Sequence, residues 1–178
     1  MNALVESNKG RSKNSALVQA EAEAGQYLTF MLGNEMFAIG ILSIKEIIEY
    51  GQLTEVPMMP AFVRGVINLR GSVVPVIDLQ LRFGRKYTEV GKRTCIVIVE
   101  VTDAASGEHH ELGVVVDSVS EVIAIPASDI EKAPAFGANL RQDFICGMGK
   151  INERFVVMLN VDNALSVNEI SELVNLSE

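Results

Sequence analysis

The chain has 178 residues, of which 48% are hydrophobic and 6% aromatic, and its formal net charge at pH 7 is -8. A chain of this length can bury roughly 70% of its unfolded surface, so folding needs no disulfide and no structural metal. The acidic balance argues against a nucleic-acid-binding protein, which would normally carry a basic face. It favours a soluble protein whose partners are other proteins.

Residues 1–25 are rich in Ser, Asn, Ala, Glu and Lys and show no sustained apolar periodicity. We expect this segment to be a flexible tail. No continuous apolar stretch follows its basic residues, so no secretory signal is expected. No run in the chain approaches the roughly 20 apolar residues that span a bilayer. The sequence therefore predicts a cytoplasmic protein with no direct membrane insertion.

From residue 26 onward the pattern is typical of one β-strand after another. Gly33-Asn34 supplies a turn between the first two strands. The nearly continuous apolar run at 94–101 predicts a strand buried on both faces, and the polar stretch at 102–111 predicts a hairpin loop. The strands expected from these patterns cover residues 26–32, 36–41, 94–101, 112–116 and 155–161.

The segment at 65–79, GVINLRGSVVPVIDL, is typical of two apolar, β-branched strands joined by a Gly-containing turn. Asn68 and Arg70 stand at this turn, between two core strands. An Arg buried without a partner would cost too much free energy. Arg70 must therefore project into solvent or meet a partner group.

Two pairs of segments match each other along the chain. Residues 65–79 align without a gap with 147–161, and residues 38–48 align with 113–123, in the same order in both halves. Such self-similarity indicates two copies of one supersecondary unit. Each copy holds about five short strands, the number at which small antiparallel sheets close into barrels.

The sequence therefore predicts one mainly β domain at 26–178. Within it, two small barrels at about 26–83 and 93–161 face each other and share a hydrophobic core. Short helical turns connect the strands. A C-terminal helix is expected at 167–176, where apolar residues return at helical spacing after the Ser166-to-Glu169 capping box.

Three features have more than one explanation. The connector at 82–93 carries five basic residues against one acid; it is either an exposed, solvated linker or a basic patch that faces an acidic partner. The adjacent Met58 and Met59 are either core filler or an adaptable contact surface. Cys95 and Cys146 lie in apolar runs and are expected to be buried, free thiols, with no disulfide indicated.

No pattern typical of catalysis is present. The two histidines, His109 and His110, are neighbours in the expected polar loop. Neighbours in an extended segment point to opposite faces, which suits a metal site poorly. No glycine-rich phosphate loop or dinucleotide fingerprint appears. The sequence therefore predicts a protein that is not an enzyme and needs neither a metal nor another cofactor.

Four carboxylates have local explanations. Glu46 and Glu121 each stand three residues after a Ser, the spacing of a capping box at a helical turn. For Glu46 a role in binding is equally open. Asp78 and Asp117 fall at strand ends, where carboxylates commonly accept turn-type hydrogen bonds.

Several motifs, in this order, resemble the CheW family of chemotaxis coupling proteins, and the resemblance covers residues 26–176. The motifs are ILSIKEI at 41–47, PAFVRG at 60–65, NLRG at 68–71, VPVIDL at 74–79 and GVVVDSVSEV at 113–122. The resemblance implies two Src-homology-3-like, five-stranded barrels around a common core and a function without catalysis.

CheW proteins bridge the cytoplasmic tips of chemoreceptors and the regulatory domain of the histidine kinase CheA. The resemblance therefore implies a protein that is monomeric when free and is recruited to membrane-associated receptor arrays. An adaptor of another chemosensory pathway, such as surface motility or second-messenger control, would have the same pattern. A metal protein that uses the His109-His110 loop is a third possibility, from a different functional class.

The resemblance also assigns functions to individual residues. It implies that Asn68 holds its turn and that the contact region for CheA includes Phe62, Arg64 and Gly65. The receptor-binding groove between the two barrels would contain Ile44, Glu46, Arg70, Val119 and Val122.

Overall fold

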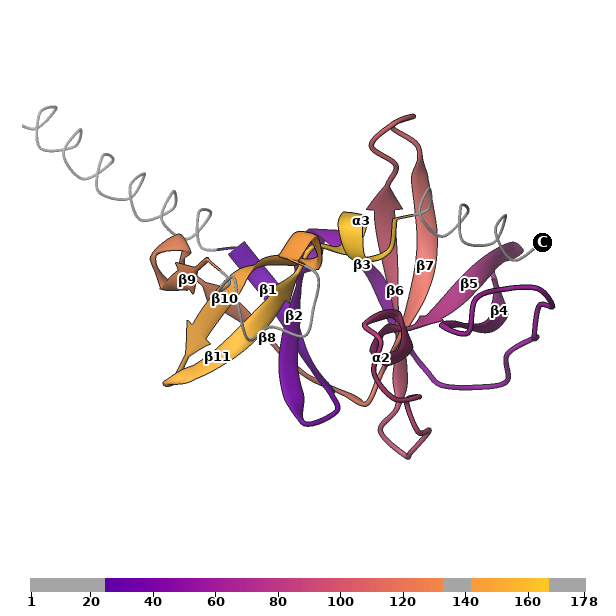
Figure 1. Cartoon of the computed structure of the whole chain (residues 1–178), viewed down its shortest axis with the longest axis horizontal. Coiled ribbons are helices and arrows are strands. Elements are labelled where there is room, and N and C mark those ends of the chain that lie inside the picture. Colours follow the sequence, from indigo (N-terminus) through magenta and orange to yellow (C-terminus); the bar gives the residue numbers. More distant parts are fainter. Residues whose placement is uncertain (1–24, 133–141, 167–178) are drawn as a thin grey trace, which may run out of the picture.

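The computed structural model describes residues 25–132 and 142–166 (Figure 1). The expected tail, apart from Gly25, and the expected helix at 167–176 lie outside these residues. The strands are β1 (Gly25–Leu32), β2 (Glu35–Gly40), β3 (Ile44–Glu49), β4 (Val63–Leu69), β5 (Ser72–Asp78), β6 (Cys95–Thr102), β7 (His109–Val116), β8 (Ser118–Ile125), β9 (Ile130–Glu131), β10 (Ile145–Ile151) and β11 (Arg154–Leu159). The helical turns are η1 (Ile41–Ser43), α2 (Leu79–Arg82), η2 (Ala127–Asp129), η3 (Gln142–Phe144) and α3 (Val161–Ala164).

The expected strands are confirmed, with small shifts at their ends. The largest difference concerns the loop expected at 102–111. Strand β6 extends to Thr102 and β7 begins at His109, so that the loop shrinks to 103–108. Both His109 and His110 therefore lie in a strand, paired with Thr102 and Val101 of β6, and their placement in a loop was wrong.

The strands form two sheets that exchange strands between the two sequence halves. A six-stranded sheet has the order β8-β1-β2-β11-β10-β9, and a five-stranded sheet has the order β3-β6-β7-β5-β4. The chain changes sheet at η1, between β2 and β3, and again at Asp117, between β7 and β8. The expected division into barrels at 26–83 and 93–161 is therefore wrong, because β1 and β2 join the sheet of the second half.

The repeat itself has a clear counterpart in the strand pairing. The first copy begins with β1 and β2 and the second with β6 and β7, and in each copy these two strands pair with the other copy. Strand β2 lies parallel to β11, and β7 lies parallel to β5. The equivalent antiparallel pairs are β1 with β8 and β6 with β3. The two copies thus complete each other's sheets.

The five-stranded sheet curls until its edges meet. Strands β3 and β4 stand at opposite ends of the strand order. Nevertheless, a bridge joins Thr54, which follows β3, to Val66 in β4, and Glu46 of β3 contacts Arg70 beyond β4. The fold is mainly β, with two Src-homology-3-like barrel subdomains, which Figure 1 shows side by side.

The two subdomains share a hydrophobic core, as the sequence predicts. Buried side chains from both sheets meet in it, among them Phe30 and Phe37 from one sheet and Val97 and Val99 from the other. Each subdomain also has a smaller core of its own. Strand β6 sends Val97 and Val99 into the shared core and Ile96 into its own barrel. Burial of β6 on both faces is confirmed.

Asp117 ties the second crossover to the β1–β2 turn. Its Oδ2 accepts a hydrogen bond of 2.7 Å from Gly33 N, and its own backbone N donates to Met31 O. Asp117 therefore accepts a hydrogen bond at a strand end, as expected, but from a distant turn and not from its own. We expect Asp117→Ala to lower the free energy of unfolding by about 1–2 kcal/mol, because Gly33 loses a charge-assisted acceptor.

Urea denaturation of the two proteins measures this difference. The matched control is Asp117→Asn, which retains a side-chain oxygen and should recover part of the loss. Equal stability of Asp117→Ala and the wild type would show that this link contributes nothing.

Candidate functional site

The β4–β5 hairpin ends in a two-residue turn formed by Arg70 and Gly71. Both residues have positive φ, +54° and +85°, which is the conformation of a type I′ turn. Asn68 Oδ1 accepts a hydrogen bond from Gly71 N at 3.0 Å, in agreement with a role for Asn68 in holding the turn. The Arg70 side chain is 80% exposed, so it projects into solvent, one of the two alternatives that the sequence permits.

Arg70 also meets a carboxylate. Its Nη2 donates to Glu46 Oε2 at 3.1 Å, and this contact joins the hairpin turn to strand β3. A guanidinium has five N–H donors, so most of the donors of Arg70 remain available to another molecule. An exposed pair of this kind contributes little to stability.

The two capping boxes expected from the sequence are not formed. Glu46 lies within β3 and Glu121 within β8. The helical turn before β3 ends at Ser43 and has no side-chain cap. In both places the Ser-x-x-Glu spacing falls in a strand that follows a crossover, and Glu46 pairs with Ile98 of β6.

The apolar residues expected in the receptor groove differ in exposure. Ile44 and Val119 are half-buried and pack against the shared core, one from β3 and one from β8, so they mark the boundary between the subdomains. Val122 is 49% exposed. Sequence reasoning missed Leu42 in the η1 crossover, which is 98% exposed. The only sign of Leu42 in the sequence is that it is an apolar residue at a point where the chain leaves a sheet.

The residues expected to contact the kinase lie in the interior. Phe62 belongs to the shared core, Gly65 is buried, and the Arg64 side chain is 4% exposed. The surface beside them is the segment between β3 and β4. In this segment, Met58 is 62% exposed and Met59 is half-buried, so Met58 fits the contact-surface explanation.

Buried Asp78 organises the region beneath this segment. It caps α2 by accepting hydrogen bonds from Gln80 N and Leu81 N, which confirms its strand-end role. It also accepts from Thr88 N at 3.0 Å and from Thr88 Oγ1 at 2.7 Å. Arg64 Nη1 lies 3.7 Å from Asp78 Oδ2. One carboxylate thus holds α2, the connector and β4 together.

The connector at 82–93 fits neither explanation offered by its composition. Arg82 lies against the rings of Phe62 and Phe144 and donates to a backbone oxygen near the end of α3. Arg85 pairs with Glu35 at 3.1 Å. The first part of the connector is therefore fixed to the protein, whereas Lys86, Lys92 and Arg93 are exposed. A local sequence cannot show these distant partners.

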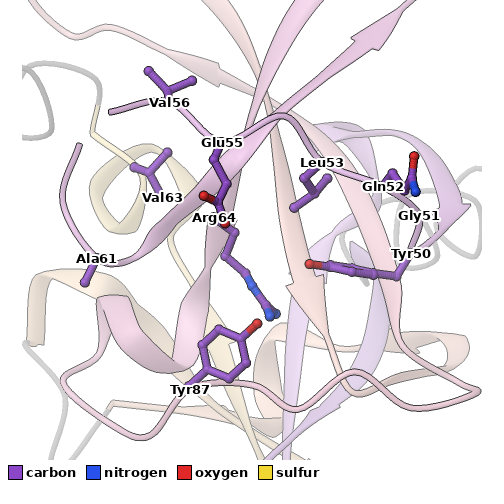
Figure 2. A pocket seen from close by; sticks show the side chains of 10 residues that line it. All are labelled: Tyr50, Gly51, Gln52, Leu53, Glu55, Val56, Ala61, Val63, Arg64 and Tyr87. Carbon is purple, nitrogen blue, oxygen red and sulfur yellow. The ribbon is translucent and has the colours of Figure 1, made fainter. Parts of the chain in front are cut away.

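A pocket of about 500 Å³ opens between the segment after β3, the start of β4 and the connector (Figure 2). Arg64 lies in this pocket between two tyrosines. Its guanidinium carbon is 3.9 Å from the centre of the Tyr87 ring and 5.2 Å from the centre of the Tyr50 ring. The other lining residues are Gly51, Gln52, Leu53, Glu55, Val56, Ala61 and Val63.

Groups that could carry chemistry are few in the described residues. Partial desolvation raises the pKa of both Cys95 and Cys146 above the ordinary value of a thiol, so neither is an activated nucleophile. Cys146 is exposed and Cys95 half-buried, so the expectation of two buried thiols was wrong. Residues 25–132 and 142–166 contain no group of three His, Cys, Asp or Glu side chains placed to hold a metal.

The same part of the chain also contains no helix long and apolar enough to cross a membrane. The features that stand out in these residues are an exposed Arg on a strained turn, apolar side chains at the boundary of two subdomains, and a polar pocket. Such features suit the binding of other molecules.

Comparison with known proteins agrees with this character. The family model described as a CheW-like domain matches residues 26–169. The chain belongs to the CheW family. It is 32% identical over 158 residues to the chemotaxis protein CheW of Klebsiella aerogenes, covering 89% of this chain and 92% of that protein. The crystal structure of the scaffolding protein TtCheW from Thermoanaerobacter tengcongensis matches with a TM-score of 0.72 and 31% identity, over 82% of this chain and 90% of that one.

A further relative, the protein FrzA of Myxococcus xanthus, is 28% identical over 142 residues, covering 79% of this chain and 84% of that protein. CheW proteins are non-catalytic scaffolds of chemotaxis, and this chain is one of them. The resemblance found in the sequence motifs is therefore confirmed at the level of family, fold and lack of catalysis.

Proposed function

We propose that this CheW-family protein couples chemoreceptors to the histidine kinase CheA and acts in the cytoplasm at receptor arrays. The observation that carries the proposal is the turn at Arg70. A side chain with a Cβ is strained at φ +54°, and a type I′ turn prefers Asn or Gly there. An Arg at this strained position, with its side chain 80% exposed, is best explained by contact with a partner.

The proposed receptor surface follows the boundary between the subdomains. Arg70 and Glu46 supply the polar part, since the free donors of Arg70 can hold a carboxylate or carbonyl group on a receptor helix. Ile44, Val119 and Val122 supply the apolar part. Apolar contacts around a charged anchor are a common arrangement at protein interfaces.

The proposed kinase surface is the exposed segment between β3 and β4. Phe62 and Gly65 support it from the interior, because their side-chain positions are covered. Exposed Met58 and Val56 would make the contact, since methionine adapts well to a partner surface.

Met58→Asp tests this surface. We expect binding to isolated CheA to weaken by at least about tenfold, because a charge replaces an apolar contact. Stability should not fall, since Met58 has a φ of +66° and Asp tolerates that conformation better than Met. The matched control is Val90→Asp, which adds the same charge at an exposed valine of the connector. Unchanged CheA binding by Met58→Asp would exclude this segment from the interface.

Co-sedimentation with receptor-containing membranes, in the presence and absence of CheA, tests the proposal as a whole. We expect the protein to sediment with receptors and to place CheA autophosphorylation under receptor control. A folded protein that does neither would refute the proposal. The second candidate function is an adaptor of a different chemosensory pathway, since FrzA, a relative that is not named for chemotaxis, matches 79% of this chain. A pull-down from the native cell lysate identifies the receptor and kinase and so separates the two.

A further inference from the structure

Arg64 has donors that the described part of the chain does not use. Its side chain is 4% exposed, and Nη1 donates to Thr88 O at 3.0 Å. Its Nη2 is buried and has no hydrogen-bond partner among the described residues. A buried donor without an acceptor is costly, more so when it carries charge. The arrangement therefore favours an acceptor supplied by another molecule.

The carboxylate of Asp78 does not use the free hydrogen-bond donors of Arg64. The separation of 3.7 Å between Nη1 and Asp78 Oδ2 exceeds a good hydrogen bond. Asp78 instead accepts from Thr88 N, Thr88 Oγ1 and Gln80 N at 2.7–3.1 Å. Because these donors occupy Asp78, Arg64 keeps the capacity to hold a second carboxylate.

The surrounding pocket is suited to such a group. Figure 2 shows the rings of Tyr50 and Tyr87 beside the Arg64 guanidinium, with the Tyr50 hydroxyl pointing toward it. Both phenols can donate hydrogen bonds. Leu53 and Val63 add apolar lining, so the site fits a carboxylate attached to a short aliphatic group better than a bare inorganic anion.

Tyr87 is the more exposed of the two tyrosines in the pocket. Its ring covers the guanidinium at 3.9 Å, yet the residue is 56% exposed and lies in the connector. Displacement of this ring toward solvent would uncover the Arg64 Nη2 and leave the Tyr50 side of the pocket in place.

We propose that Arg64 binds a carboxylate in this pocket once the Tyr87 ring has moved aside, with the Tyr50 hydroxyl as an additional donor. The carboxylate can belong to a free short-chain acid or to an acidic side chain of a peptide, since both present the same group. Glu55 lines the same pocket and is exposed, so its charge opposes an anionic ligand. This charge gives the proposal a sharp test.

Two-dimensional NMR of the full chain measures binding of two probes, isovalerate and N-acetyl-glutamate α-methylamide, at constant ionic strength. We expect saturable shifts at Tyr50, Arg64 and Tyr87 with at least one probe. Tighter binding of isovalerate would assign the site to free acids, and tighter binding of the glutamate derivative to acidic peptides. Equal shifts with sodium chloride, or shifts that never saturate, would overturn the proposal.

Three variants test whether the probes bind at this pocket. Glu55→Gln should tighten binding about threefold, the size expected for removing one repulsive surface charge. Arg64→Lys should weaken it at least about tenfold, because lysine cannot present the guanidinium's paired donors. Glu131→Gln removes the charge of an exposed side chain in the other subdomain and should leave the affinity for the probes unchanged. If Arg64→Lys fails to fold, the Glu55→Gln result still decides, and unchanged affinity in Glu55→Gln would contradict a site at this pocket.

Discussion

Replacing Arg70 with Asn is expected to abolish receptor coupling while leaving the protein at least as stable as the wild type. Asn is a preferred residue at the first position of a type I′ turn, and it relieves the strain of Arg70 at φ +54°. We expect the free energy of unfolding to stay the same or to rise by as much as about 1 kcal/mol. Lost function in a protein that is no less stable would identify Arg70 as a contact residue.

Urea denaturation and receptor-controlled CheA autophosphorylation together measure this result. Binding to isolated CheA serves as the internal control and should persist. Arg70→Glu should lose coupling as well, because its charge repels Glu46 and any receptor carboxylate, with a stability change within about 1 kcal/mol. If Arg70 served only to fix the turn to Glu46, Arg70→Asn would be less stable and would still couple receptors to the kinase.

The fold could be predicted to the level of the repeat but not to the level of strand pairing. Strict apolar alternation and the buried run of β6 identify strands locally. The match of 65–79 with 147–161 predicts two equivalent hairpins, and these are β4–β5 and β10–β11. The exchange of β1 and β2 into the other sheet was missed. Self-similarity shows that two units are alike, but it does not show which unit contributes strands to which sheet.

The placement of the candidate site residues could be predicted where a local rule decides it, and could not be predicted where burial decides it. Asn68 and Arg70 follow from the hairpin turn, whose geometry is set by neighbouring residues. Phe62 precedes strand β4, and Gly65 lies within it against the segment at Leu53 and Thr54; no local pattern shows such packing. A helical cap was one of two explanations for Glu46, and it is wrong because the spacing from Ser43 fits a strand as well as a cap.

Gly65→Asp is expected to destroy the fold, and with it kinase binding, without Gly65 being a contact residue. Gly65 has a φ of +153°, which residues with a Cβ rarely adopt. A Cβ built there would lie 2.6 Å from Thr54 O. This oxygen belongs to the backbone bridge between Thr54 and Val66 that closes the barrel, so it cannot move aside cheaply. A buried, unpaired carboxylate adds a further cost.

We expect the free energy of unfolding of Gly65→Asp to fall by at least about 3 kcal/mol, measured by urea denaturation where the variant folds at all. Gly51→Asp is the matched control, because it adds the same charge beside the same pocket at a glycine with open space around it. Its stability should not change. A stable Gly65→Asp protein that fails to bind CheA would instead make Gly65 part of the interface. If CheA binding is lost only to the extent that the protein unfolds, Gly65 acts through the fold. The contact with CheA would then be made by the exposed segment around Met58, because the barrel closure at Thr54 and Val66 holds that segment in place.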